Sequence, residues 1–386
     1  MALRLATPFL TAAEESLMAF EPASPTRTVR LDFRHHDDLA HVHEAIRLEL
    51  SALSLHGRSL WLSNDELATV ERLLLQDDGS FGEHRFFSLA DIFDLPEGAG
   101  GRMDIEGLEV DPAGPWLWVV GSHSLMRAKA IPGRHETGEA FARLTEIRRE
   151  RNRHFLGRIP LVAVDERGTF ELREEAPPSD GSGTLRAAHL DSGAGLDGLL
   201  ADDPHIGPFM TIPAKENGFD VEGVVARGEQ VFVGLRGPVL GRWAVLIELA
   251  VDEIGPGRLA PRPLDDAGRR YRKHFMDLCG VGMRDFAFDG DSLVILAGPS
   301  MDLDGPQIVF RWPGCLETRS DSMVPADRLE RLVILPHGEG TDHAEGISLM
   351  ETGHGKELLV VYDCPDPKRL PEDGRSIDAD AFAFGF

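Results

Sequence analysis

Short runs of apolar residues, bounded by glycine, proline or charged residues, follow one another along most of the chain. Residues 104–108 (DIEGL) begin with an acidic phrase, and residues 115–121 (PWLWVVG) follow them as an aromatic and aliphatic run. Two such runs with turn residues between them are typical of two antiparallel strands. The pattern therefore predicts a mainly β protein built from strand–turn–strand units.

The same unit recurs with an acidic residue at one place in its first strand. The copies begin at residues 43–46, 104–108, 220–224, 284–288 and 343–347. Their acidic residues are Glu44, Glu106, Glu222, Asp285 and Glu345. Three of the four intervals are about sixty residues long, which is the kind of period that several-stranded propeller blades produce. We expect an all-β fold, a β-propeller of about five blades, with six blades as the alternative.

The remaining interval is about twice as long and predicts an insertion in the second blade at about residues 124–218. Residues 155–162 and 168–172 are expected to be outer strands of that blade, and the spacing at 138–153 and 184–203 predicts surface helices.

The predicted domain boundaries depend on pairing between segments near the two ends of the chain. Residues 28–33 alternate suitably to pair with residues 380–384 and close the ring. Residues 27–386 are then a single propeller domain, and residues 1–26 are expected to be a loose N-terminal arm.

Composition narrows the range of partners and compartments. The net charge of -25 argues against nucleic-acid binding, which needs clustered basic residues, and favours cations or cationic partners. Cys279, Cys315 and Cys364 give neither a disulfide framework nor a paired metal motif. No segment has the apolar length of a signal peptide or a membrane span, so we expect a cytoplasmic protein that does not contact a membrane.

The acidic positions predict a site, because the first strand of each propeller blade lines the central channel. Carboxylates at one place in each first strand would converge there and repel one another unless a cation neutralises them. An oxygen-rich ring suits Ca²⁺, or Mg²⁺ and Mn²⁺. Alternatively each Glu-Gly pair is structural, with the carboxylate bonding to the next blade and the glycine allowing close strand approach.

The residues that end each second strand differ between units, which favours a binding pocket over a purely structural repeat. Asp65, His123, Arg236 and Asp363 stand at these ends and offer acidic, basic and anion-binding groups. The preceding loops add further polar candidates, among them Lys215, Asn217, His337 and His343. An isolated histidine is more often structural than functional, and Arg236 and Arg284 could equally form structural salt bridges.

One segment departs from the acidic character of the chain. Residues 127–158 contain nine Lys or Arg and four Glu. A solvated helix face explains such a run, and a docking surface is the alternative. Nucleotide-binding and nucleophile-elbow motifs are absent from the sequence.

The repeated phrases also resemble a known family. Residues 102–108, 121–125, 215–223 and 234–238 resemble a bacterial family catalogued as domain of unknown function 3616, over roughly residues 40–384. More distantly, the acidic phrases resemble those of esterase-like phytase propellers and of calcium-dependent apyrases, five-bladed nucleotidases with calcium in the channel. The resemblance implies metal ligands at Glu44, Glu106, Glu222, Asp285 and Glu345, with Lys215, Arg236 and Arg284 holding phosphate.

These observations lead to three functional hypotheses. The first is a metal-dependent hydrolase of a small anionic substrate, a phosphate ester or anhydride, in which His123 or Asp65 moves the proton and Lys215, Asn217, Arg236, Arg284 and Asp363 bind substrate. The second is a non-catalytic propeller that binds a small ligand or protein partner and uses the acidic ring only to tie its blades together. The third is a sugar lactonase, a hypothesis that Asn64 and Asn217 support.

Overall fold

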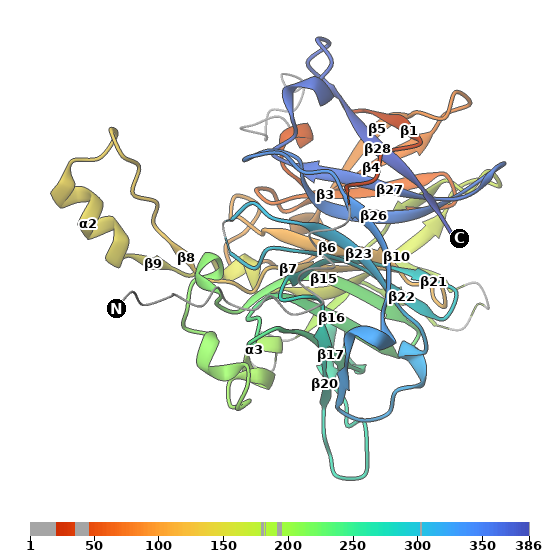
Figure 1. Ribbon diagram of the computed structural model, residues 1–386. Coiled ribbons are helices and arrows are strands. Elements are labelled where there is room, and N and C mark those ends of the chain that lie inside the picture. The colour runs from red at the N-terminus through yellow and green to blue at the C-terminus, as the bar shows by residue number, and fades with distance from the viewer. Residues whose placement is uncertain are drawn as a thin grey trace.

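A computed structural model describes residues 21–34, 46–178, 181, 183–190, 195–301 and 303–385. The protein is mainly β (Figure 1). The α-helices among the described residues are α2 (Thr137–Thr145) and α3 (Leu196–Leu200), and several short 3-10 turns connect strands. None of the described helices has the length and apolar character needed to cross a membrane.

The strands form antiparallel units, each wound outward from its first strand. The first unit contains β2 (Leu50–His56), β3 (Ser59–Asn64), β4 (Thr69–Leu75) and β5 (Phe81–Ser88). The second contains β6 (Ile105–Val110), β7 (Trp116–Gly121), β10 (Leu156–Ala163) and β14 (Ala188–Leu190), with β11 (Phe170–Leu172) also paired to β10. The predicted outer strands of this unit are therefore confirmed.

The later units follow the same order. The third contains β15 (Asp220–Arg227), β16 (Gln230–Gly237), β17 (Trp243–Leu249) and β20 (Tyr271–Asp277), to which β24 (Ser322–Val324) adds in parallel. The fourth contains β21 (Gly282–Asp289), β22 (Ser292–Gly298), β23 (Gln307–Trp312) and β25 (Glu330–Leu335). The last contains β26 (His343–Thr352), β27 (Gly355–Asp363), β28 (Ser376–Phe384) and β1 (Arg27–Asp32).

The last unit joins the two ends of the chain. β1 pairs with β28 in antiparallel register, with Thr28 opposite Asp380, so the predicted pairing of these segments is confirmed. Residues 21–26 continue along the same edge, where Ala23 N–H donates to the carbonyl of Ile334 and Thr26 N–H to that of Ala381. This part of the predicted loose arm is therefore held against the body, and residues 1–20 lie outside the described residues.

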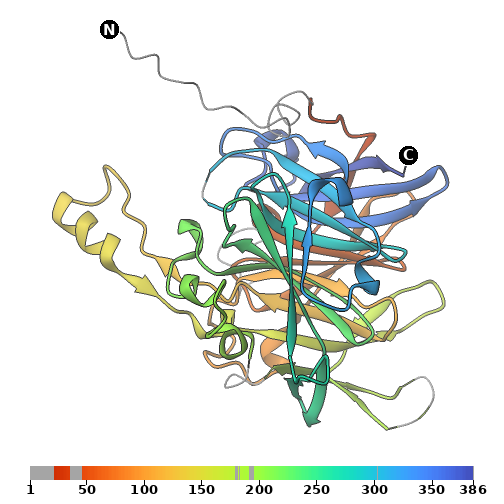
Figure 2. The same cartoon turned by 60° about the horizontal axis from the view of Figure 1, so that its bottom comes forward.

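The first strands of the units contact one another in a closed cycle, which passes from β2 to β6, β15, β21, β26 and back to β2. Apolar side chains fill the space between neighbouring units: Trp118 and Val224 share one cluster, for example, and Phe232 and Phe286 share another. Figures 1 and 2 show the stacked, twisted sheets that result. The arrangement is of the β-propeller type, in which radially packed sheets place their first strands around a central axis.

Each first strand carries a register shift that corresponds to a β-bulge near its start. The residues at these shifts are Ser51, Glu106, Glu222, Arg284 and Glu345. The repeated phrases predict Asp285 at the position of the glutamates, and this prediction is wrong, because Asp285 lies one residue after the bulge, where other units have glycine or alanine. The bulge position in the first unit is occupied by Ser51, and Glu44 lies outside the described residues.

The glycine after the bulge allows close approach of neighbouring first strands. A Cβ atom added to Gly107 would lie 2.7 Å from Cα of Gly223, which is closer than real Cβ contacts come. One added to Gly346 would lie 3.0 Å from N of Leu53. The glycines of these Glu-Gly phrases therefore have the predicted structural role, which is to let neighbouring strands approach closely.

The long interval between the second and third acidic phrases contains several different elements. β8 (Met126–Arg127), α2 and β9 (Ile147–Arg148) form an arm that projects from the sheets in both views (Figures 1 and 2). The helices are shorter than predicted, because α3 covers only Leu196–Leu200 and the residues before it form β13 (Leu185–Arg186) and β14. The minor strands are β12 (Glu175–Ala176), which pairs with β13, and β18 (Val251–Gly255) and β19 (Arg258–Pro261), which extend the second sheet.

Candidate functional site

The first strands begin, and the second strands end, at the same end of the cycle, which we call the channel mouth. Ile105 lies opposite Gly121, Asp220 opposite Gly237, and His343 opposite Asp363. Any side chain at the start of a first strand therefore lies near one that ends a second strand. Charged residues of both signs are concentrated here.

Two arginines neutralise much of the predicted acidic ring. The guanidinium of Arg236 contacts Asp220, and its Nη1 lies 2.9 Å from Oε1 of Glu222. Nη1 of Arg284 lies 3.2 Å from Oε2 of Glu222 and 2.6 Å from Oε1 of Glu345. Arg284 thus stands at the bulge position of its own unit and links the carboxylates of the two flanking units. The ring is an ion-pair network and not a cage of carboxylates alone.

Glu106 is the ring carboxylate left outside this network. It makes no hydrogen bond or ion pair with any of the described residues, and the carboxylates of Glu222, Asp104, Glu345 and Asp220 repel it, while Arg236 is near enough to attract it. Burial, followed by the repulsion of these carboxylates, raises the pKa of Glu106 well above its ordinary value. A cation placed beside Glu106 would relieve both costs, so this part of the ring has the charge that a metal ion needs.

Asp65 lies in a second acidic group at the mouth. Burial and the neighbouring Asp104 raise its pKa to about 6, although Arg102 opposes this shift with its Nη2 3.2 Å from Oδ2 of Asp65. Asp363 adds to the repulsion. A carboxyl group with a pKa near neutrality can exchange a proton at physiological pH, so Asp65 suits the proton-transfer role predicted for it.

Asp285 has a different environment from the ring glutamates. It is fully buried, and its Oδ2 accepts a hydrogen bond of 2.8 Å from the backbone N–H of Ile347 in the next unit. Burial raises its pKa well above the ordinary value. Its contact is the one expected for an acid that ties one unit to the next, and the bulge places Arg284 at the predicted metal-ligand position instead.

His123, the other predicted proton carrier, has both ring nitrogens engaged. Its Nδ1 lies 2.9 Å from Oδ1 of Asp197, and its Nε2 lies 3.1 Å from the carbonyl oxygen of Phe155. The side chain is 3% exposed. Neither nitrogen is free to exchange a proton with a substrate at the mouth in this arrangement.

The two asparagines that favoured a lactonase hold loops in place. Oδ1 of Asn64 accepts hydrogen bonds from the N–H groups of Glu66 and Leu67, and Oδ1 of Asn217 accepts one of 2.9 Å from Val239 N–H. Asn217 also has a φ of 59°, a left-handed conformation that asparagine tolerates better than most residues. The amide of Asn217 and the amide oxygen of Asn64 are therefore engaged with the backbone, while the amide nitrogen of Asn64 is buried without a hydrogen-bond partner among the described residues.

The predicted substrate-binding residues lie in two places. Some lie in the strands at the channel mouth, which we call the wall, and others in the loops around it, which we call the rim. Arg236 and Arg284 lie in the wall, with side-chain exposures of 13% and 9%. Lys215 lies in the 3-10 turn Ala214–Glu216, close enough to Cys364 to influence its pKa. Cys364 directly follows Asp363, so Lys215 lies on the rim beside the end of β27. His337 is exposed in the loop before β26, and His343 Nε2 lies 3.1 Å from Oδ1 of Asp304.

Sequence reasoning missed Asp104 and Asp220, which belong to the same charge network. Asp104 pairs with Arg153 from the 3-10 turn Arg151–Arg153, and Asp220 pairs with Arg236. The signal was present, because each aspartate stands two residues before the glutamate of its phrase. Asp104 also has a φ of 51°, and such strained residues concentrate at functional sites.

A serine, a histidine and a glutamate elsewhere resemble a hydrolytic triad in outline. Nδ1 of His274 lies 2.8 Å from Oγ of Ser322, and Nε2 lies 3.1 Å from Oε2 of Glu248. The imidazole is fully buried between sheets, at 0% exposure. A similar buried contact of 2.6 Å joins His84 and Glu71 in the first unit, so this is a repeated packing device and not a reactive site.

Residues 49–380 match the family described as protein of unknown function (DUF3616). The chain belongs to this family. The match to DUF3616 covers every first strand of the cycle, and the family resemblance of the repeated phrases is thereby confirmed. No curated protein matches the chain.

Solved structures give distant similarities to this DUF3616 protein. A glutaminyl cyclase from Myxococcus xanthus is 10% identical with a TM-score of 0.38, and the match covers 94% of this chain and 100% of that one. The allergen Mala s 1 from Malassezia sympodialis is 10% identical with a TM-score of 0.40, covering 87% and 94%. The periplasmic gluconolactonase of Pseudomonas aeruginosa is 13% identical with a TM-score of 0.30, covering 86% and 88%.

Proposed function

We propose that the protein is a five-bladed propeller that hydrolyses a small anionic substrate, a phosphate ester or anhydride, at the channel mouth with a divalent cation. The observation that carries the proposal is the position of Glu106. This carboxylate is repelled by four other carboxylates and forms no ion pair with any of the described residues, while Arg236 attracts it from a longer distance and Arg284 lies across the same mouth. A cation-binding side and an anion-binding side therefore adjoin, as a site for a metal-bound phosphate requires.

Acidic and basic residues have different roles in this proposal. Glu106, with the oxygen of Glu345 that Arg284 does not contact, would hold the ion, and Ca²⁺, Mg²⁺ or Mn²⁺ suits these oxygen ligands. A bound ion supplies charge neutralisation and a polarised water molecule. Arg236 and Arg284 hold the phosphoryl oxygens, with guanidinium groups already fixed by carboxylates. Asp65, with its pKa near 6, accepts the proton of the attacking water.

The test combines metal content with turnover. Purified protein is analysed by elemental mass spectrometry and melted with EDTA and with added Ca²⁺, Mg²⁺ or Mn²⁺, and then screened on phosphate esters and anhydrides. We expect stoichiometric metal, a chelator-sensitive melting temperature and phosphate release that Glu106→Gln abolishes while the circular dichroism spectrum stays unchanged. Glu229→Gln, at an exposed glutamate of the β15–β16 turn, is the matched control. Absent metal, unchanged melting and no turnover would together overturn the proposal.

The contacts between units favour one second candidate, a non-catalytic propeller that binds a ligand or partner. Arg284 joins Glu222 to Glu345, Ser51 Oγ donates a 2.5 Å hydrogen bond to the carbonyl of Ile105, and Asp285 accepts from the next unit. On this alternative the charged ring only stabilises the fold. Glu106→Gln would then change the melting temperature without changing any turnover of the wild-type protein.

A further inference from the structure

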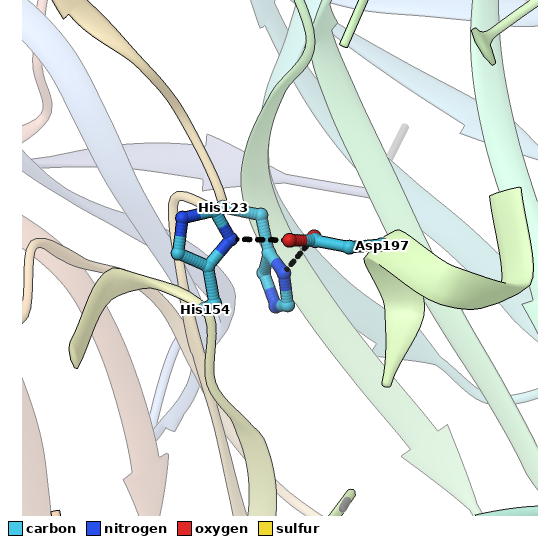
Figure 3. Close-up of side chains that lie close together, drawn as sticks. All are labelled: His123, His154 and Asp197. Carbon is cyan, nitrogen blue, oxygen red and sulfur yellow. Dashed lines mark hydrogen bonds and ion pairs between the residues drawn. The ribbon is translucent and has the colours of Figure 1, made fainter. Parts of the chain in front are cut away.

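Two imidazoles and a carboxylate converge at one point, as Figure 3 shows, and none of the three belongs to the ring of charges at the channel mouth. His123 follows β7, His154 follows the 3-10 turn Arg151–Arg153, and Asp197 lies in the first turn of α3. Their ligating atoms all lie within 4.8 Å of one another. Nδ1 of His123 is 2.9 Å from Oδ1 of Asp197, and Nδ1 of His154 is 2.6 Å from Oδ2.

The second nitrogen of His123 fixes which atom faces the carboxylate. Nε2 lies 3.1 Å from the carbonyl oxygen of Phe155, and a carbonyl can only accept, so Nε2 carries the proton. In the neutral ring Nδ1 then presents a lone pair to Oδ1 of Asp197, and two acceptors face each other. A cation between them, either a second proton on the ring or a metal ion, resolves this conflict. A histidine whose other N–H donates to a backbone carbonyl is also the usual arrangement in metal sites.

The backbone holds His123 in this orientation at a cost. Its φ is 53°, a left-handed conformation that is uncommon outside glycine, although histidine adopts it more readily than most residues. The strained residue is fixed by a hydrogen bond of 3.0 Å from its N–H to the carbonyl of Arg153, the residue before His154. One loop contact therefore aligns both imidazoles, and strain of this kind is typical of ligand-holding positions.

Arg149 is the charged group that could oppose a cation here. Its Nη2 lies 2.6 Å from Oδ2 of Asp197 and 3.5 Å from Nδ1 of His154, and its side chain is 58% exposed. The guanidinium thus approaches from solvent the oxygen that faces His154, and it must move aside for a metal ion to bind between these two side chains. Ligating carboxylates are commonly oriented by such an outer hydrogen bond, which leaves Oδ1 available.

We propose that His123, His154 and Asp197 bind a divalent transition-metal ion, with Zn²⁺ as the best fit. Two imidazoles and one carboxylate are a nitrogen and oxygen set that suits Zn²⁺ and not the hard ion proposed for the channel. Zn²⁺ bonds of about 2.0–2.2 Å separate tetrahedral ligands by about 3.3–3.5 Å, so the hydrogen-bonded side chains must part by less than about 1 Å. Three protein ligands leave a fourth position for water or a ligand group.

The experiment titrates metal-free protein with Co²⁺ and Zn²⁺. We expect one equivalent of Co²⁺ to give the visible absorption of a tetrahedral site, Zn²⁺ to displace it, and Zn²⁺ to raise the melting temperature. Asp197→Asn, which keeps the side-chain shape, should weaken binding at least tenfold, whereas Glu106→Gln and the exposed control His354→Ala should not.

Two results would overturn the site. One is wild-type binding of Co²⁺ or Zn²⁺ no tighter than that of Asp197→Asn. The other is an unchanged melting temperature of the wild-type protein in excess Zn²⁺. Arg149→Met separates the alternatives further, because a metal site retains Zn²⁺ binding without Arg149, whereas a purely ionic cluster only loses stability.

The projecting arm carries an independent inference. It exposes four large apolar side chains, Ile131 at 39%, Phe141 at 69%, Leu144 at 47% and Ile147 at 44%. Helix α2 buries none of its residues against the described body. Apolar groups gathered on a thin projection mark interaction sites, because a soluble monomer gains nothing by exposing them.

Charge identifies the partner of this arm. Residues 126–148, which form the arm, contain five Lys or Arg and three Glu, whereas the whole chain carries -25. The arm is positive and has an apolar face, so its charge complements that of a strongly acidic body. In a symmetric dimer each arm lies on the body of the other copy, so that both arms are covered in one assembly. We propose that the arm docks on the body of a second copy of this chain.

Light scattering after gel filtration tests the exchange. We expect a dimer for the wild-type protein at low salt, a shift toward monomer at high salt, and a monomer for Phe141→Ser with Leu144→Ser. The matched control Ile254→Ser removes an equally exposed apolar group, 55% exposed on β18, and should remain dimeric. A wild-type protein that is monomeric at all concentrations, or a dimer that the double variant retains, would overturn the proposal.

Discussion

Nη1 of Arg284 lies 2.6 Å from Oε1 of Glu345, across the boundary between the fourth and the last unit of the cycle. The same atom lies 3.2 Å from Oε2 of Glu222 on the other side. The Arg284 guanidinium therefore supplies, beside Glu222 and Glu345, the positive charge that a ring of carboxylates alone would have to take from a bound cation. The shortage of positive charge remains around Glu106.

Removing this guanidinium should expose the repulsion that it screens. We expect Arg284→Met to lower the free energy of unfolding by about 3 kcal/mol at pH 8, because two nearly buried carboxylates lose a partner. Added Ca²⁺ should recover part of the loss. Chemical denaturation with and without Ca²⁺ measures both. Arg186→Met, at the exposed pair with Glu175, is the control and should change stability by less than about 1 kcal/mol.

Glu109 should make the protein less stable as pH rises. Burial, opposed by hydrogen bonding to Ser54, raises its pKa to about 8, above the ordinary value of 4.5. The folded state therefore binds this proton more tightly than the unfolded state, and stability falls between about pH 4.5 and pH 8. We expect Glu109→Gln to match the wild type at pH 5 and to exceed it at pH 9. Parallel thermal melts that show the same pH slope for both proteins would contradict this.

Gly107 should tolerate no side chain. Its added Cβ would meet the backbone of Gly223 and Val224 at 2.7 Å, and a backbone in a closed ring cannot move aside cheaply. Gly107→Ala should destabilise the fold by about 2–4 kcal/mol, or prevent soluble expression. Gly100→Ala, which has open space around it, should be neutral in the same denaturation assay. Equal stability of the two variants would mean that β6 and β15 do not approach as described.

Ser322 should have no part in hydrolysis, despite its contact of 2.8 Å with His274. The histidine ring is buried against Trp312 and Phe232, so no substrate reaches it. We expect Ser322→Ala to lower the melting temperature by a few degrees, as the loss of about 1 kcal/mol does, and to leave phosphate release unchanged. Loss of turnover at full thermal stability would show instead that the triad is reactive.

The sequence by itself determined the repeating unit, the mainly β architecture, the pairing of β1 with β28 and the glycines that follow the acidic residues. These features depend on local alternation, turn residues and repeated phrases, which are readable one segment at a time.

Only the tertiary structure decided which residues occupy equivalent places in the first strands of the units, and therefore which charges meet in the ring. The bulge in β21 places Arg284 at the position of the ring glutamates and Asp285 one residue beyond, and a one-residue offset changes where a strand side chain points. The contact of His123 with His154 and Asp197 joins residues 74 positions apart through a loop and a short helix. Spacing along the chain does not encode such contacts, because they depend on how separate segments pack.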